Sequence, residues 1–112
     1  MSEKNMRYSL LLDFYGELLP NAQRDMIDLY YNEDLSLSEI AEQIGITRQG
    51  VRDSVRRAEE ALSDYEKKLG MAERFAHLSE VEILLHKIQN ATSESEVKSL
   101  TDIALSTIHT MQ

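Results

Sequence analysis

The stretch that decides the fold runs from Leu35 to Leu62, LSLSEIAEQIGITRQGVRDSVRRAEEAL. Its first part predicts a short helix, because Ser36 can cap a helix and Glu39, three residues later, completes a capping box. Gly45 suits the turn that follows, where a left-handed backbone would strain a residue with a Cβ. Thr47 can then cap a second helix. Two capped helices joined by a glycine turn predict a helix-turn-helix motif.

Apolar side chains at helical spacing give this motif an interior. The first helix presents Ile40, Ala41 and Ile44, and the second presents Val51, Val55, Ala58 and Leu62. Ala41 is small, as the close crossing of two such helices requires. We expect Ile46 to fill the corner between the helices.

The outward positions of the second helix carry Arg48, Gln49, Arg52, Arg56 and Arg57. This is the helix that would enter a DNA major groove. Arg48 and Arg52 lie four residues apart and could reach either guanine or a phosphate, and Gln49 could pair with adenine. Arg56 is expected to meet the DNA backbone. Arg57 is expected to meet a phosphate or an acidic neighbour.

A plainer interpretation of the same positions is a solvated helix face. Side chains four residues apart, such as Asp53 and Arg57, could pair with each other instead of with DNA. Asp53 also lies within the second helix, where phosphate would repel it. Both interpretations remain open from the residues alone.

The charge of the whole chain is acidic, with 20 acidic and 12 basic residues and a formal net charge of −8. Proteins that bind DNA usually carry a basic surface, because neutralising phosphates supplies much of the affinity. The basic residues are focused, however, since four of the 12 lie between Arg48 and Arg57. We therefore expect nucleic acid to approach one face only.

Several classes of function find no support. The 112 residues include no cysteine, which excludes disulfides, thiol catalysis and cysteine-ligated zinc. His77, His86 and His109 are scattered, and neither a nucleophile elbow nor a glycine-rich phosphate loop is present. We expect no catalytic site, metal or cofactor. No apolar run approaches the ~20 residues that cross a bilayer, and no signal peptide is evident, so we expect a cytoplasmic protein without membrane contact.

Helical patterns continue along nearly the whole chain. The first helix is expected over 4–18, the second over 21–31, and Pro20 separates them. The helix-turn-helix motif follows over 36–62, and its second helix is expected to continue to Leu69, where Gly70 ends it. The predicted first domain is residues 1–69.

The predicted second domain, residues 70–112, is a helical hairpin. Apolar residues at helical spacing run from Met71 to Ile88, and Ser93 with Glu96 predicts another capping box at the start of a last helix. Two helices bury only one face of each against the other, so we expect a homodimer through residues 71–111. Packing within one chain is the alternative. The predicted fold class is all-α.

The middle of the chain resembles region 4 of bacterial sigma factors. Matching positions are Leu19, Pro20, Gln23, Arg24, Tyr30, Leu35, Ser36, Glu39, Ile40, Ala41, Gly45, Ile46, Thr47, Val51, Arg57 and Ala58. Ser54 departs from the pattern, since sigma factors often carry a basic residue there. The resemblance covers roughly the middle 45 residues and implies a helix-turn-helix bundle.

The whole chain is similar to the YlxM family of small Gram-positive bacterial proteins, through MRYSLLLDFYGELL, ITRQGVRDSVRRAE and the C-terminal hairpin. The resemblance implies a helix-turn-helix regulator linked to the signal recognition particle pathway, because the family's gene lies beside that of the particle's GTPase. Two hypotheses follow. One is a dimeric regulator that binds a two-fold DNA site. The other is a protein-interaction module that docks onto a ribonucleoprotein or its GTPase, and its acidic flanks would suit a basic partner. Binding to the particle's RNA is a third, although no aromatic stacking platform is evident.

Overall fold

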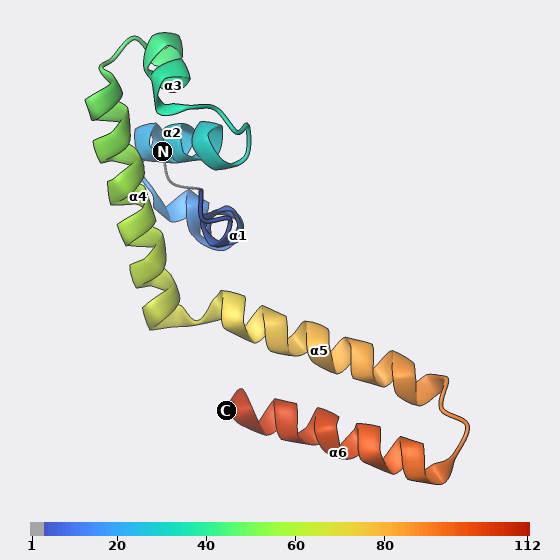
Figure 1. Cartoon of the computed structure of the whole chain (residues 1–112). Helices are drawn as coiled ribbons and strands as arrows, with labels where there is room; N and C mark the ends of the chain where they lie inside the picture. The colour runs from blue at the N-terminus through green and yellow to red at the C-terminus, as the bar shows by residue number, and fades with distance from the viewer. Residues whose placement is uncertain (1–3) are drawn as a thin grey trace. The chain divides into compact units, whose positions relative to one another are not determined.

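The structure is a computed structural model that describes residues 4–112, and every regular element within this range is helical. Residues 1–3 of the predicted first domain lie outside the described residues. The elements are α1 (Arg7–Tyr15), a 3-10 turn η1 (Gly16–Leu18), α2 (Asn21–Tyr31), α3 (Leu37–Ile44), α4 (Arg48–Leu69), α5 (Met71–Gln89) and α6 (Glu94–Thr110), as Figure 1 shows. The prediction of an all-α fold is confirmed.

Contacts between the elements divide the chain into two units, Met1–Gly70 and Met71–Gln112. In the first unit, α1, α2 and α3 all pack against α4, which is the longest helix (Figure 1). Its core consists of apolar side chains from all four helices, of which the largest fully buried ones are Tyr15, Leu11, Ile27, Ile40, Leu62 and Val51. Burying such side chains is the main stabilising contribution to a unit of this size.

The predicted helix ends are confirmed for α2 and for the end of α4, where Gly70 has a φ of 61°. The first helix differs from the prediction, because α1 begins at Arg7 and the 3-10 turn η1 replaces its last residues. The Asn5 side chain accepts a hydrogen bond from the Arg7 backbone N–H (3.0 Å), which starts the helix later than expected. Lys4 meanwhile is held by the end of α2 and by the segment that follows it.

The expectation that Ile46 fills the corner of the helix-turn-helix was wrong. Its side chain is 43% exposed, and Ile44 at the end of α3 is also exposed. The interior of the corner is occupied by Ile40 and Val51, which are fully buried. Ile46 instead lies over the first turn of α4, where its Cδ1 is 3.6 Å from the place a Cβ at Gly50 would take.

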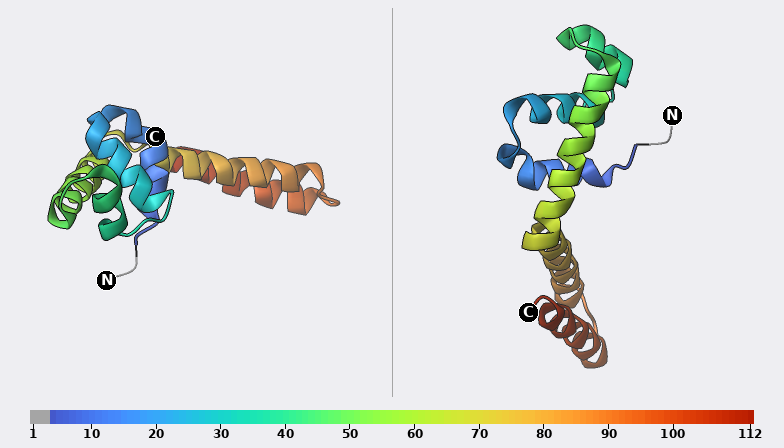
Figure 2. Two further views of the ribbon diagram at one scale, coloured as in Figure 1. Left: turned by 90° about the horizontal axis from the view of Figure 1, so that it is seen from above. Right: turned by 90° about the vertical axis from the view of Figure 1, so that its left-hand side faces the viewer.

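The second unit is a hairpin in which α5 and α6 run side by side in opposite directions (Figure 2). Ser93 Oγ accepts the Glu96 backbone N–H (3.1 Å), as the predicted capping box requires. The second bond of a capping box would run from the Ser93 backbone N–H to the Glu96 carboxylate. Here the Glu96 carboxylate instead accepts the N–H of Thr92 (3.3 Å). The extended backbone at Ser93 (φ −138°) accompanies this shift of the bond by one residue.

Candidate nucleic-acid interface

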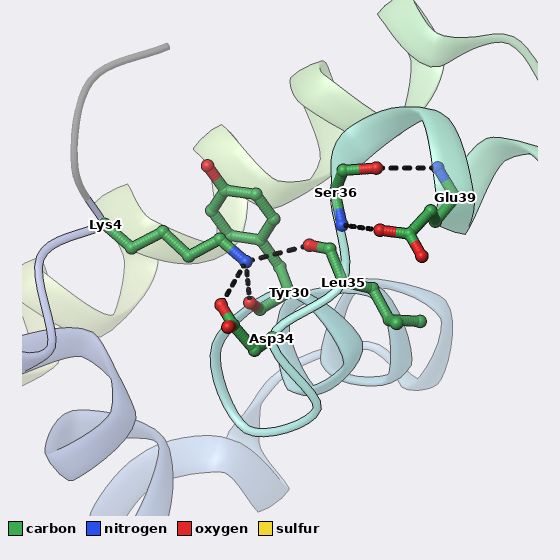
Figure 3. Close-up of polar contacts among 6 residues, drawn as sticks. All are labelled: Lys4, Tyr30, Asp34, Leu35, Ser36 and Glu39. Atoms are coloured by element: carbon green, nitrogen blue, oxygen red, sulfur yellow. Dashed lines mark hydrogen bonds and ion pairs between the residues drawn. The ribbon is translucent and has the colours of Figure 1, made fainter.

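The start of α3 is fixed by two reciprocal hydrogen bonds, which Figure 3 shows. Ser36 Oγ accepts the Glu39 backbone N–H, and the Glu39 carboxylate accepts the Ser36 backbone N–H, both at 3.0 Å. The hydrogen bond from the Ser36 backbone N–H favours the ionised carboxylate, and together with the Ser36 side chain it holds the pKa of Glu39 below its usual value. The capping box therefore orients α3 against the helix that follows.

The turn between α3 and α4 is built around the left-handed Gly45, whose φ is 86°. The Ala41 carbonyl accepts both the Gly45 N–H (2.9 Å) and the Ile46 N–H (3.1 Å), which closes the end of α3. Thr47 Oγ1 then caps α4 by accepting the Gly50 N–H (3.0 Å). A Cβ at position 50 would lie 3.1 Å from that same oxygen, so glycine leaves room for the cap.

Three of the predicted contact residues come together on one side of α4. Arg48, Arg52 and Arg56 line a hollow of about 600 Å³. The hollow lies between α2, α4 and the segment that precedes α1. The remaining lining residues are Lys4, Asn5, Tyr30, Tyr31, Leu37, Val55 and Glu59. The arginines follow one another at intervals of four residues, so they form a single row along the helix.

The pairing of these arginines is sparse. Arg56 Nε lies 3.7 Å from a carboxylate oxygen of Glu60, and both side chains are exposed, so the pair contributes little to stability. Within residues 4–112, no carboxylate forms an ion pair with Arg48 or Arg52. Two guanidinium groups thus face the hollow with their charge available to a ligand.

The other two predicted contact residues, Gln49 and Arg57, do not line this hollow. Gln49 Nε2 donates to Asp53 Oδ1 (3.0 Å), and this exposed pair replaces the Asp53–Arg57 pair of the plainer interpretation. The predicted contact residues therefore divide into the arginine row beside the hollow and two residues outside it, Gln49 and Arg57.

Lys4 is a residue of this site that the sequence patterns did not indicate. Its ammonium donates to the carbonyls of Tyr30 (2.5 Å) and Leu35 (2.8 Å) and pairs with Asp34 (3.1 Å), as Figure 3 shows. It also lies 4.0 Å above the Tyr30 ring, and only 13% of its side chain is exposed. Lys4 thereby fixes the segment before α1 as one wall of the hollow.

The floor of the hollow is tyrosine-rich and buried. The Tyr31 hydroxyl donates to a carboxylate oxygen of Glu59, which joins α2 to α4. Burial, followed by this hydrogen bond and the Glu59 charge, raises the pKa of Tyr31 well above its usual range. Burial also raises the pKa of Tyr30, with Glu59 adding to the shift and Arg48 opposing it. Tyr30 is 9% and Tyr31 is 5% exposed, so both rings are largely covered.

Residues 4–112 contain neither a cluster of possible metal ligands nor a helix that could span a membrane. No group of three or more histidine, aspartate or glutamate side chains in this range could hold a metal ion. His86 and Glu82 lie 3.8 Å apart as an exposed pair. None of the described helices is both long enough and apolar enough to span a bilayer.

The fold and this arrangement define a helix-turn-helix protein. A family model described as "Putative helix-turn-helix protein, YlxM / p13 like" matches residues 2–103, and the chain belongs to this family, UPF0122. The resemblance to YlxM noted from the sequence is confirmed.

Curated relatives from several bacteria share the family name. A UPF0122 protein of Desulforamulus reducens is 52% identical over 73 residues, which cover 65% of this chain and 62% of the relative. One from Clostridium kluyveri is 49% identical over 78 residues, 70% of each chain. One from Bacillus cereus (strain AH187) is 43% identical over 96 residues, 86% of this chain and 84% of the relative.

Proposed function

We propose that this protein is a non-enzymatic regulator that binds DNA through α4. The observation that carries the proposal is the row of Arg48, Arg52 and Arg56 along one hollow, in a chain whose net charge is −8. Two of these guanidinium groups have no carboxylate partner within residues 4–112, so phosphate would be their natural counter-ion. A role in transcription regulation would act in the cytoplasm, where a bacterial chromosome lies.

The proposed regulator is a homodimer joined through residues 71–111. The hairpin leaves large apolar side chains exposed on both helices, among them Leu78, Ile83, Leu85, Ile103 and Leu105. Large apolar side chains exposed in this number on two neighbouring helices favour a partner that covers part of them. A second copy would cover it and would give the assembly a two-fold axis suited to a palindromic site.

Fluorescence anisotropy tests DNA binding. The purified protein is titrated into a labelled duplex from upstream of its own operon, at low and at moderate salt, beside an Arg48→Ala/Arg52→Ala variant. We expect binding that weakens with salt and is lost in the variant. A Lys67→Ala/Lys68→Ala variant removes the same charge from the last turn of α4, away from the hollow, and should bind nearly as well.

A second candidate is a protein-interaction module of the signal recognition particle pathway. The observation in its favour is a second hollow, lined by the acidic Asp13, Glu17, Asp25 and Asp28 together with Leu12, Gly16, Arg24 and Asn32. A basic partner, such as a protein component of a ribonucleoprotein, would suit this surface. Absence of duplex binding at low salt, with binding to the particle's RNA or its GTPase instead, would favour this candidate over the first.

A further inference from the structure

Arg48 and Arg52 of α4 lie on a different side of the helix from Gln49 and Asp53, whereas Arg56 lies close to the side of Gln49. Its buried stripe is Val51, Val55, Ala58 and Leu62. At about 100° per residue, Gln49 and Asp53 lie on the side opposite that stripe. The arginine row begins at Arg48 on the flank beside the hollow and turns gradually outward to Arg56. A ligand that covers α4 therefore meets two chemically distinct surfaces.

The outermost side carries a carboxylate held in place by an amide. Gln49 Nε2 donates to Asp53 Oδ1 at 3.0 Å, and both side chains are exposed. A carboxylate is repelled by phosphate, but it can accept a hydrogen bond from the amino group of cytosine. The amide oxygen and remaining N–H of Gln49 can pair with adenine. This side suits base edges and does not suit a phosphate backbone.

The flank has the opposite chemistry. Successive arginines of the row rise by about 6 Å along the axis, and Arg48 and Arg52 have no carboxylate partner within residues 4–112. Guanidinium groups bind phosphate through paired N–H donors. Lys4 holds the facing wall of the hollow in place, so the row borders an ordered surface.

We propose that α4 binds duplex DNA with a division of roles. Arg48, Arg52 and Arg56 bind backbone phosphates, and Gln49 with Asp53 contacts base edges in the major groove. Asp53, which opposes binding by its charge, thus determines sequence preference. This inference rests on the proposed DNA binding and assigns the two tasks to separate residues.

The test compares two duplexes over a range of salt concentrations by fluorescence anisotropy. One duplex is selected from a random-sequence pool by the wild-type protein, and the other is a shuffled sequence of equal composition. For Arg52→Ala we expect equal weakening on both duplexes. The slope of log Kobs against log salt should become shallower by about 0.9, because one fewer phosphate is neutralised.

For Asp53→Ala we expect the opposite behaviour. Binding to the shuffled duplex should tighten, because a negative charge near phosphate is removed. The preference for the selected duplex should fall by about tenfold, because a base contact is lost. Glu60→Ala is the matched control, since Glu60 is an exposed acid of α4 that pairs with Arg56. It should tighten both duplexes without changing the preference.

Distinct results overturn the inference and the proposed function. If Asp53→Ala keeps the wild-type preference, or if Arg52→Ala loses preference with an unchanged salt slope, the division of roles is wrong. It is also wrong if the wild type binds duplexes but selects no consensus. If the wild type binds neither duplex at low salt, the proposed DNA binding itself fails.

Discussion

At the scale of single residues, Tyr31 connects α2 to α4 beneath the arginine row. Its hydroxyl donates to Glu59, and its ring lies 5.7 Å from that of Tyr8 and 5.0 Å from that of Tyr30, edge-on to the latter. Aromatic rings in such arrangements stabilise each other beyond their burial. Tyr31 thus makes a polar contact through its hydroxyl and aromatic contacts through its ring.

We predict that Tyr31→Phe destabilises the protein by about 1–2 kcal/mol near neutral pH, because Glu59 loses a hydrogen-bond donor. The pKa of Tyr31 is raised in the folded state, so its contribution is present below the unfolded pKa of about 10. The contribution is lost as pH rises above that value. Urea unfolding at a series of pH values should show the difference between the two proteins shrinking above about pH 10. A difference that grows with alkalinity would contradict this prediction.

The residues that could be predicted from the sequence are those whose partners lie nearby in the chain. Ser36 and Glu39 of the capping box lie three positions apart, and the box was predicted from the sequence alone. Lys4, by contrast, bonds to groups 26 to 31 residues away, and no local pattern signals such a partner. The hydrogen bond between Tyr31 and Glu59 escaped prediction for the same reason.

At the scale of elements, the turn between α3 and α4 depends on the backbone of Gly45. Its φ of 86° is a conformation that residues with a Cβ rarely adopt, and apart from its two chain neighbours no residue lies within 4 Å of the place a Cβ would take. The requirement for glycine is therefore conformational and not steric.

We predict that Gly45→Ala destabilises the first unit by about 1 kcal/mol, because alanine is strained in the left-handed region. Gly45→Asn should cost clearly less, because asparagine tolerates this conformation. Thermal unfolding followed by circular dichroism would measure both variants. A loss from asparagine as large as that from alanine would contradict the conformational explanation.

Helix ends were predicted well where a cap or a glycine marks them, as at Ser36, Thr47 and Gly70. The start of α1 and the place of Ile46 were predicted wrongly. In both cases tertiary neighbours decide the outcome. Lys4 is drawn to the end of α2 and to the segment that follows it, and Ile40 with Val51 already fills the corner that Ile46 was expected to occupy.

At the scale of the whole molecule, the hairpin is the part of the chain that a single copy covers least. Among its residues only Ala72 and Ala104 are buried, while Leu78 is 56% and Leu85 is 54% exposed. The apolar spacing in the sequence predicted the two helices, since spacing reports which residues share a face. It does not report what covers that face, so the homodimer remains a proposal.

We predict that Leu85→Glu converts the proposed dimer to a monomer, because burying a carboxylate in an apolar interface is unfavourable. Sedimentation equilibrium would measure the mass. Ser95→Glu places the same charge at an exposed polar position of α6 and should leave the dimer intact. A wild-type protein that sediments at 12.9 kDa, the mass of one chain, would refute the homodimer.

The arrangement of the candidate interface could likewise be predicted only in part from the sequence. The sequence predicted which side chains point outward from the second helix of the motif. It could not separate the arginine row from the pair of Gln49 and Asp53, because that separation depends on Lys4, Tyr30 and the hollow they enclose with α4. The contact residues themselves remain predictions until binding is measured.

The position of Lys4 has a practical consequence for anyone who prepares this protein. Lys4 is clamped at the edge of the hollow that the arginine row lines, so peptide fused upstream of it is attached beside the proposed binding surface. A polyhistidine or acidic tag there would add its own charge to every titration and alter the salt dependence. Affinity tags therefore belong after Gln112, at the other end of the chain.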